Sequence, residues 1–275
     1  MNDSRLRRPS AVRTLRVGDL KVTYVPDGAM LLKPAAAPSA VLDRHLEGYA
    51  AHLNDTRRLV ANTGGLLVEL GARALLIDTG FGPRAVPEDP AHPYRGAVHG
   101  GSLPGNLALL GRAPEDIETV AFTHLHADHI GWACVEPSPF ARAAFVIPKG
   151  EWDRRDPAAA VLEPRTQLVL ADDEIFPGVR VFTVPGGDGG PTGFAITSHG
   201  TRLLAFGDTL LTALQVRHPE WSVTADADTV RAARDRRRLI AELLRPATLG
   251  FGLHFADVVF GRARPHGEGA AWHPL

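Results

Sequence analysis

The chain has 275 residues, a formal net charge of −1 and one cysteine; hydrophobic residues make up 44% of it and charged residues 22%. This balance is typical of a globular protein with a sizeable core, and the near-neutral charge argues against nucleic acid as the main partner. A lone Cys134, interpreted as a small buried apolar residue, excludes an internal disulfide and fits a reducing compartment. No apolar run suffices for a signal sequence or a membrane span. We therefore expect a cytoplasmic protein.

The first half of the chain reads as a tail followed by strand-rich segments. The arginine-rich residues 1–14 predict a flexible, loosely attached tail, and one folded domain is expected over 15–275. Patterning then predicts, in chain order, a strand at 15–26, a turn at Asp27-Gly28, a linker at 35–39, a helix at 41–53, and a hairpin of strands at 62–70 and 73–78. Beyond them we expect a long surface loop at 83–105 and a short helix at 106–110.

The second half repeats this strand-rich arrangement. It predicts strands at 144–147, 179–184, 193–198, 202–206 and 248–255, and helices at 149–153 and 225–244. Each half delivers an aspartate at the end of an apolar strand, namely Asp78 and Asp208. No linker separates the halves, so the pattern indicates two sheets packed face to face with helices outside. We expect one four-layered αββα sandwich.

The most informative segment follows the apolar run 120–122 and reads Thr123-His124-Leu125-His126-Ala127-Asp128-His129. Alternate residues of a strand share a face, so His124 and His126 can point at one ion. Asp128 and His129 then lie on the following turn, close enough to hold a second ion. Imidazole with carboxylate is ligand chemistry for zinc, iron or manganese and not for calcium.

This segment resembles the signature of the metallo-β-lactamase superfamily, and the resemblance covers most of the chain. It implies that Asp208 bridges two ions, that His254 is a late ligand and that Asp78 orients a ligand. It assigns His124 and His126 to the first ion, and it assigns Asp128, His129 and His254 to the second. The segment 215–221, the arginine-rich helix and the His254-Phe255 pair look most like the methyl-parathion-hydrolase and lactonase-like branch.

The resemblance fails at the third ligand of the first ion. Family members place a histidine in a Pro-Gly-His-Thr loop, but this chain reads Pro185-Gly186-Gly187-Asp188, and glycine offers no ligand. Asp188 could replace the histidine, because the flanking glycines relax the backbone, or it could be an ordinary loop aspartate. Three states stay open: Asp188 completes the site, the first site is empty or weak, or the protein has abandoned hydrolysis. A third carboxylate would shift the preference from zinc towards manganese or iron.

Several other residues receive structural interpretations. His199 is expected in an exposed turn, and His92 and His99 in a polar loop. His266 or His273, in the C-terminal segment 262–275, could replace the lost ligand in place of Asp188. Trp132 and Trp221 are interpreted as core or surface aromatics in preference to residues that wall the pocket.

The resemblance implies a hydrolase. Paired ions lower the pKa of a bound water so that it attacks a carbonyl or phosphoryl centre, with Asp128 and Asp208 as the catalytic carboxylates. The leading hypothesis is a metal-dependent hydrolase of a small ester, lactone or phosphotriester that uses one or two divalent ions, zinc before manganese or iron. The alternatives are a single-metal cyclase, lyase or isomerase, and a metal-poor binding protein. We expect a small-molecule substrate and neither a nucleic acid nor a membrane partner; a homodimer stays open.

Overall fold

The computed structural model describes residues 4–33, 49–185, 191–222, 226 and 228–275. The linker predicted at 35–39, most of the helix predicted at 41–53, and Gly187 with Asp188 lie outside the described residues. None of the helices in the described ranges is long and apolar enough to cross a bilayer.

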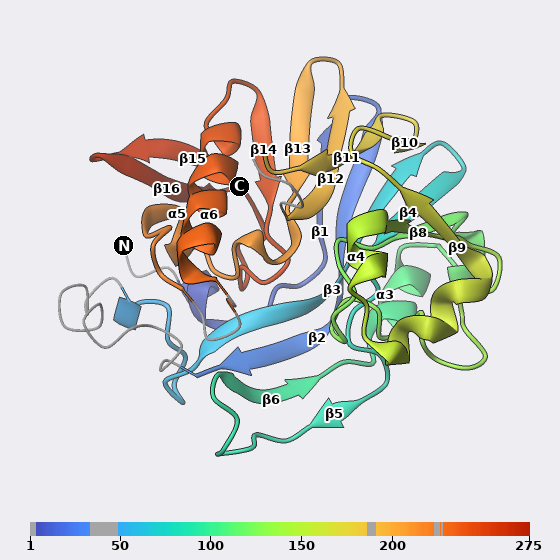
Figure 1. Cartoon of the computed structure of the whole chain (residues 1–275), viewed down its shortest axis with the longest axis horizontal. Coiled ribbons are helices and arrows are strands. Elements are labelled where there is room, and N and C mark those ends of the chain that lie inside the picture. Colours follow the sequence, from blue (N-terminus) through green and yellow to red (C-terminus); the bar gives the residue numbers. More distant parts are fainter. Residues whose placement is uncertain (1–3, 34–48, 186–190, 223–225, 227) are drawn as a thin grey trace.

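The described strands form two sheets, of nine and seven strands (Figure 1). The first sheet has the order β5-β6-β2-β3-β4-β7-β8-β9, with β1 paired to β2, and the second runs from β10 to β16 in chain order. The first comprises β1 (Arg13–Val17), β2 (Leu20–Leu32), β3 (Leu59–Leu70), β4 (Arg73–Ile77), β5 (Ala85–Val86), β6 (Arg95–His99), β7 (Thr119–Ala121), β8 (Ala144–Pro148) and β9 (Thr166–Val169). The second comprises β10 (Glu174–Phe176), β11 (Val179–Thr183), β12 (Thr192–Ser198), β13 (Thr201–Ala205), β14 (Thr248–Phe251), β15 (Phe260–His266) and β16 (Gly269–Pro274).

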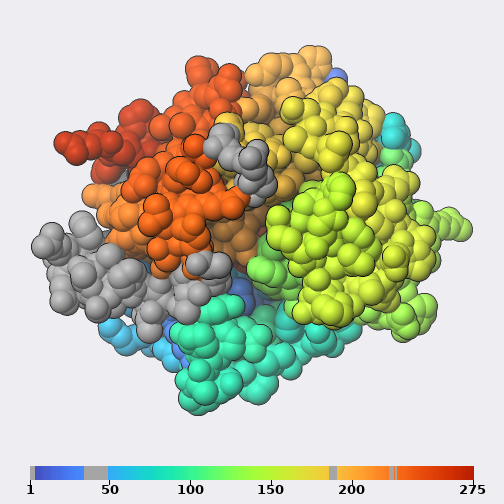
Figure 2. Space-filling view, viewed as in Figure 1, coloured from blue at the N-terminus to red at the C-terminus, as the bar shows by residue number. Residues whose placement is uncertain are grey.

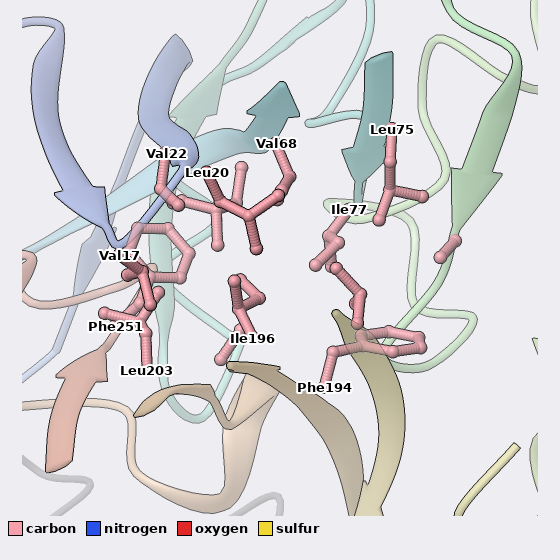
Figure 3. Close-up of a cluster of buried hydrophobic side chains, with 14 of the residues drawn as sticks. Val17, Leu20, Val22, Val68, Leu75, Ile77, Phe194, Ile196, Leu203 and Phe251 are labelled. Atoms are coloured by element: carbon pink, nitrogen blue, oxygen red, sulfur yellow. The ribbon is translucent and has the colours of Figure 1, made fainter. Parts of the chain in front are cut away.

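Apolar side chains from both sheets meet in one buried cluster. Val68 and Ile77 of the first sheet face Phe194, Ile196 and Leu203 of the second (Figure 3). Because alternate residues of a strand point to opposite faces, these residues fill the space between the sheets. Burial of each such side chain contributes about 2 kcal/mol to folding.

Helices cover the outer faces of both sheets. On the first sheet, Leu107 of α3 (Leu103–Leu109), Trp152 of α4 (Lys149–Asp153) and Leu162 of η4 (Pro157–Arg165) pack on the strands. On the second, α5 (Leu214–Arg217) and α6 (Thr229–Leu243) do so, with Leu239 and Leu243 on the buried stripe of α6. The order helix, sheet, sheet, helix confirms the predicted αββα sandwich.

The parallel strands of each sheet end at one edge. β4 and β7 are parallel neighbours in the first sheet, and β13 and β14 are parallel neighbours in the second. The carboxyl ends of parallel strands lie at a common edge, where α/β proteins bind their ligands. Asp78, His124, Asp208 and His254 each follow one of these four strands within three residues. The topology therefore gathers the residues singled out in the sequence.

The tail predicted at 1–14 is wrong for its described part. Ser4–Arg7 forms the 3-10 helix η1, and β1 begins at Arg13. Arg8 and Arg13 both pair with Asp257, whose side chain is almost fully buried. The partner lies more than 240 residues away along the chain, so local composition suggested a tail where a distant carboxylate anchors the segment.

The turn predicted at Asp27-Gly28 is also wrong. β2 continues through these residues with a bulge between Pro26 and Gly28. The Asp27 carboxylate is buried, and it accepts hydrogen bonds from the backbone N–H groups of Phe81, Gly82, Gly101 and Leu103 and from the indole of Trp132. A residue that favours turns thus ties three loops to the sheet.

Two further segments differ from expectation. The surface loop predicted at 83–105 contains β5, β6 and the start of α3, and the C-terminal segment 262–275 belongs to the hairpin of β15 and β16. The last predicted strand, at 248–255, ends at Phe251, so His254 lies in the connection that follows β14. The predicted hairpins at 62–78 and 193–206 are confirmed by β3 with β4 and by β12 with β13.

Candidate metal centre

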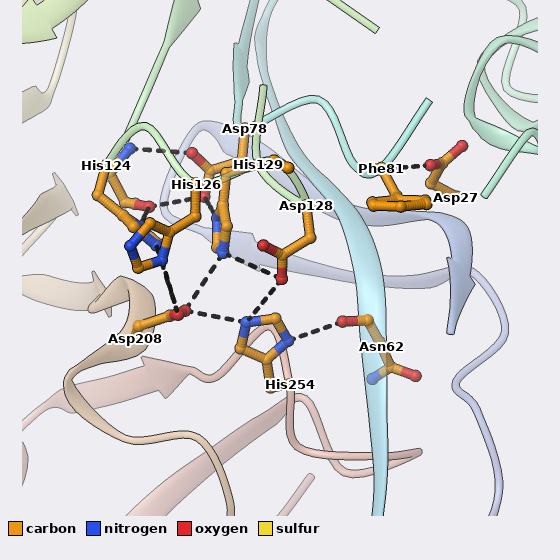
Figure 4. A network of polar contacts seen from close by, with 12 residues as sticks. Asp27, Asn62, Asp78, Phe81, His124, His126, Asp128, His129, Asp208 and His254 are labelled. Carbon is orange, nitrogen blue, oxygen red and sulfur yellow. Dashed lines mark hydrogen bonds and ion pairs between the residues drawn. The ribbon is translucent and has the colours of Figure 1, made fainter. Parts of the chain in front are cut away.

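The predicted ligands within the described residues converge at the edge where β4, β7, β13 and β14 end (Figure 4). Among the described residues, two groups have ligand atoms within 4.8 Å of one another, and they consist of His124, His129 and Asp208, and of Asp128, His129 and His254. The connections after β7, β13 and β14 supply these side chains. Asp208 lies in η5 (Gly207–Thr209), the short turn that follows β13. Asp188 lies outside the described residues.

Asp208 is central to the cluster. Its Oδ1 atom lies 2.9 Å from His254 Nε2 and 3.2 Å from His129 Nε2, and its Oδ2 atom lies 3.4 Å from His124 Nε2. Asp128 lies on the other side, with Oδ2 at 3.7 Å from His129 Nε2 and 3.8 Å from His254 Nε2. The two carboxylates therefore face the same pair of imidazoles.

Acceptors behind the rings fix their orientation. His254 Nδ1 lies 2.8 Å from the Asn62 carbonyl oxygen, and His129 Nδ1 lies 2.9 Å from Asp78 Oδ2. A carbonyl or carboxylate oxygen only accepts, so Nδ1 carries the hydrogen in each ring. In the neutral imidazole, the Nε2 lone pair then points at Asp208 and Asp128. A fixed tautomer of this kind is typical of metal-binding histidines.

Asp78 also orients His124, through Thr123. The Thr123 hydroxyl donates to Asp78 Oδ2 at 2.9 Å, and it therefore accepts from His124 Nδ1 at 3.1 Å. The Thr123 backbone N–H donates to Asp78 Oδ1 at 2.9 Å. One carboxylate thus directs the Nε2 atoms of two histidines into the site.

The backbone around Asp78 is strained and firmly held. Its φ of 61° lies in the left-handed region, which is uncommon for a residue with a side chain. The Asp78 N–H donates to Ala121 O at 2.8 Å, and the Thr79 N–H donates to His129 O at 2.6 Å. These bonds join the end of β4 to both ends of the segment 121–129.

Burial and charge shift the pKa values of the cluster. Burial lowers the pKa of His129, but the Asp78, Asp208 and Asp128 carboxylates outweigh it and raise this pKa well above its ordinary value. The pKa of His254 is raised in the same way, against burial, by Asp208 and Asp128. Burial raises the pKa of Asp208, yet the surrounding histidines hold it well below the usual range. The metal-free cluster therefore favours imidazolium beside carboxylate.

These residues fit a divalent cation. His129 Nε2 is fully buried and has no hydrogen-bond partner among the described residues, although Asp208 Oδ1 lies 3.2 Å from it. An imidazole lone pair beside a carboxylate is repulsive unless a proton or a cation lies between them. Nitrogen and carboxylate donors together suit zinc, manganese or iron.

His126 is the exception within the motif. Its side chain is 70% exposed, and it belongs to neither of the two groups found among the described residues. Its Nδ1 atom lies 2.9 Å from His124 Nε2 and 4.0 Å from Asp208 Oδ2. His124 and His126 are therefore adjacent, as their spacing predicts, while His126 lies at the rim of the cluster.

The remaining aromatic residues lie elsewhere. His266 and His273 are exposed on the β15–β16 hairpin, and neither belongs to the two described groups. His199 is in an exposed turn, as predicted, and contacts Asp19. Trp221 is buried and stacks on His218, which confirms its interpretation as a core aromatic.

Two residues of the site escaped the sequence analysis. Thr123 lies in the quoted motif but received no role, and Asn62 is fully buried within the apolar strand β3. A buried asparagine requires hydrogen-bond partners, so its position among apolar residues was the available signal. Its partners, however, lie near His254 and could not be identified from the sequence.

A cavity of about 500 Å³ opens at Asp208, His124 and His126. Figure 2 shows the hollow between the side of α6 and the side of α4. Beyond the histidine motif and Asp208, its described charged lining comes from α4, α6 and the residues just before α6, and consists of Glu151, Arg154, Asp226, Asp228, Arg231, Asp235 and Arg236. The described wall of the cavity therefore carries charged side chains beside apolar surface, to which Pro191 and Ala232 belong.

Comparisons with known proteins agree with this fold. The structure resembles AidC, a dizinc quorum-quenching lactonase (TM-score 0.78, 19% identity, 97% of this chain and 98% of that one). It also resembles the hydrolase AbOPH of the β-lactamase superfamily (0.78, 20%, 98% and 99%) and a probable metal-dependent hydrolase from Staphylococcus aureus (0.76, 20%, 95% and 99%). No curated protein matches the chain. Residues 65–252 match the family described as the metallo-beta-lactamase superfamily, and the chain belongs to this family.

Proposed function

We propose that the chain is a metal-dependent hydrolase whose ligands are His124, His126, Asp128, His129, Asp208 and His254. The observation that carries the proposal is the pair of buried histidines, His129 and His254. Their Nδ1 atoms are fixed by Asp78 and Asn62, and their Nε2 atoms face the same two carboxylates. Asp208 would help to hold both ions where two are bound. Zinc is the first expectation, and manganese or iron are the alternatives.

A divalent ion, when bound, supplies Lewis-acid chemistry that favours ionisation of water and polarises a carbonyl or phosphoryl group. Asp128 would transfer the proton of that water. Its Oδ2 atom faces His129 and His254, and these histidines lower its pKa against the effect of burial, so the carboxylate is ionised near neutral pH. An ionised carboxylate can accept a proton from the attacking water and return it to the leaving group.

The proposed substrate is a small ester, lactone or phosphotriester. The lactonase AidC was solved with an acyl-homoserine product, which makes a lactone a reasonable first substrate to test. The described wall of the cavity carries acidic and arginine side chains from α4 and α6. These side chains can pair with polar substituents of a substrate, while Pro191 and Ala232 in the same wall offer apolar contact.

The branch and the atypical first site belong to the same proposal. Neighbours described as a lactonase and as hydrolases cover almost the whole chain, which supports the methyl-parathion-hydrolase and lactonase-like branch. Gly187 removes one family ligand, and Asp188 is the proposed replacement. A small-molecule substrate and a cytoplasmic location, favoured by the lone Cys134, complete the proposal.

A single-metal lyase, cyclase or isomerase is the second candidate. It is favoured by the exposure of His126, which lies outside both described ligand groups. With Gly187 in place of a histidine, the group of Asp128, His129 and His254 could then act alone. Such an enzyme would bind one ion and leave hydrolytic substrates unchanged.

The test is hydrolysis by metal-loaded protein. Purified chain loaded with zinc, manganese or iron is assayed on ester, lactone and phosphotriester panels, with and without a chelator. We expect metal-dependent turnover that His254→Gln reduces by at least about 100-fold, since loss of an ion's ligand removes the metal chemistry. His273→Gln, an exposed histidine on the outer hairpin, is the matched control and should keep full activity. Fully metallated protein without turnover on any panel would refute hydrolysis.

A further inference from the structure

The N-terminal segment holds the connection that carries His254 through contacts of Arg8, Ser10 and Arg13 with Asp257, and these contacts are called the grip. This connection, residues 252–259, joins β14 to β15, and its Asp257 side chain is only 2% exposed. Asp257 Oδ1 accepts from Arg13 Nε at 3.0 Å, Arg13 Nη2 at 2.6 Å and Ser10 Oγ at 3.1 Å. Asp257 Oδ2 accepts from Arg8 Nε at 3.0 Å and Arg8 Nη2 at 2.8 Å. Two forked guanidinium contacts to one carboxylate fix both distance and orientation.

Asn62 connects this grip to the histidine. Its backbone oxygen accepts from His254 Nδ1 at 2.8 Å, and its side-chain nitrogen donates to Leu253 O at 3.1 Å and to Ala256 O at 2.5 Å. Its side-chain oxygen accepts from the backbone N–H of Ser10 at 2.8 Å. Ser10 therefore contacts both Asn62 and Asp257, so the N-terminal segment, β3 and the connection form one hydrogen-bonded unit.

The connection needs such support. Ala256 has a φ of 44°, in the left-handed region that an alanine holds only when its surroundings enforce it. The backbone N–H of Asp257 donates to Arg5 O at 3.0 Å, and Arg5 Nε donates to Asp257 O at 3.1 Å. The turn immediately after His254 is thus held in place by residues from the opposite end of the chain.

We propose that Asp257, held by Arg8 and Arg13, is a positioning residue that keeps His254 Nε2 aimed at the metal site. The inference rests on the proposed metal site and on no particular reaction. When the grip is lost, Ala256 relaxes to an ordinary conformation, and the His254 ring turns away from Asp208. The ion that depends on His254 then binds less tightly, although every ligand is still present.

The test measures metal affinity and coordination in variants of the full chain. Asp257→Asn and the double variant Arg8→Gln/Arg13→Gln are compared with Arg16→Gln, which removes an exposed arginine from the same N-terminal strand. Zinc affinity is measured by competition with a chromophoric chelator, and the visible spectrum of the cobalt-loaded protein reports the coordination geometry. We expect the two grip variants to bind the His254-dependent ion 10- to 100-fold more weakly, the range typical of residues that orient ligands. Their cobalt spectra should change, and Arg16→Gln should match the wild type.

Two further variants separate positioning from general stability. Ala256→Gly on the Asp257→Asn background removes the backbone strain, so it should restore part of the lost affinity. If Asp257→Asn does not fold, Arg13→Lys, which keeps the charge but not the fork, should give a smaller loss in the same direction. Variants that melt at lower temperature but keep wild-type affinity and cobalt spectrum would overturn the inference. Wild-type chain that binds no ion would instead defeat the proposed metal site itself.

Discussion

His129 Nδ1 lies 2.9 Å from Asp78 Oδ2, and the same oxygen accepts the Thr123 hydroxyl that orients His124. One carboxylate at the end of β4 therefore controls two imidazoles after β7. The two strands are parallel neighbours, with Ile77 paired to Ala121, so their carboxyl ends hold these groups side by side. The sheet topology thus converts a separation of about fifty residues into direct contact.

Replacement of Asp78 by asparagine should weaken both metal binding and the fold, by similar free energies. The amide keeps the size but has an NH₂ group in place of one acceptor, so His129 and Thr123 cannot both keep their bonds. We expect a 10- to 100-fold loss of zinc affinity and a loss of about 1–3 kcal/mol in the free energy of unfolding. Chelator competition and urea denaturation measure the two effects. Asp172→Asn is the control, because Asp172 also has a positive φ, of 67°, but is exposed.

Metal uptake should release protons near pH 7. The pKa values of His129 and His254 are raised in the metal-free cluster, because nearby carboxylates outweigh the opposing effect of burial. An ion that takes the Nε2 atoms must displace the protons, so affinity falls as the pH falls. Calorimetric titration with zinc in two buffers of different ionisation enthalpy should show proton release. Identical heats in both buffers would show that the cluster is already deprotonated.

The stability of the chain should fall between pH 6.5 and 4 through His52. Burial, with a smaller contribution from Arg7, lowers the pKa of His52 to about 4. In the unfolded chain the pKa of His52 is about 6.5, so His52 takes up a proton there at a pH at which it stays neutral in the folded chain. This difference lowers the free energy of unfolding by up to about 3 kcal/mol. Urea denaturation of the metal-free chain against pH measures this slope. His52→Gln should flatten it, and an unchanged slope in that variant would assign the acid sensitivity to other groups.

Arg154 should select for anionic substituents on the substrate. It lines the cavity from the end of α4, and its side chain is 59% exposed and pairs with Glu151. An ion pair between so exposed a side chain and a substrate anion would contribute about 0.2–1 kcal/mol, so Arg154→Gln should raise KM for anionic substrates only, by up to about 5-fold. Arg155→Gln is the neighbouring control, since Arg155 packs over Trp152 and is not among the described lining residues. Equal changes in KM for neutral and anionic substrates would contradict a role of Arg154 in selecting anionic substrates.

Sequence patterns predicted the elements that depend on residues close together in the chain. Alternation located the hairpins, and the histidine motif with Asp78, Asp208 and His254 located the cluster, because strand ends carry these residues. Asp27 was misread, since its donors at Phe81 and Gly101 come from loops that no local pattern connects to it. The role of Arg8 and Arg13 depends equally on Asp257, at the other end of the chain. The features that could not be predicted from the sequence are therefore the hydrogen bonds that buried carboxylates form with distant parts of the chain.

The content of metal per chain tests the central claim most directly. Elemental analysis is made after purification and again after loading with zinc, manganese or iron, on the wild type, His254→Gln and the control His273→Gln. The account predicts one to two ions per chain for the wild type and the control, with at least one ion lost in His254→Gln. A value of two would support Asp188 as the replacement ligand, and a value of one would favour the single-metal candidate. Wild-type chain that retains no ion under any loading condition would contradict the account.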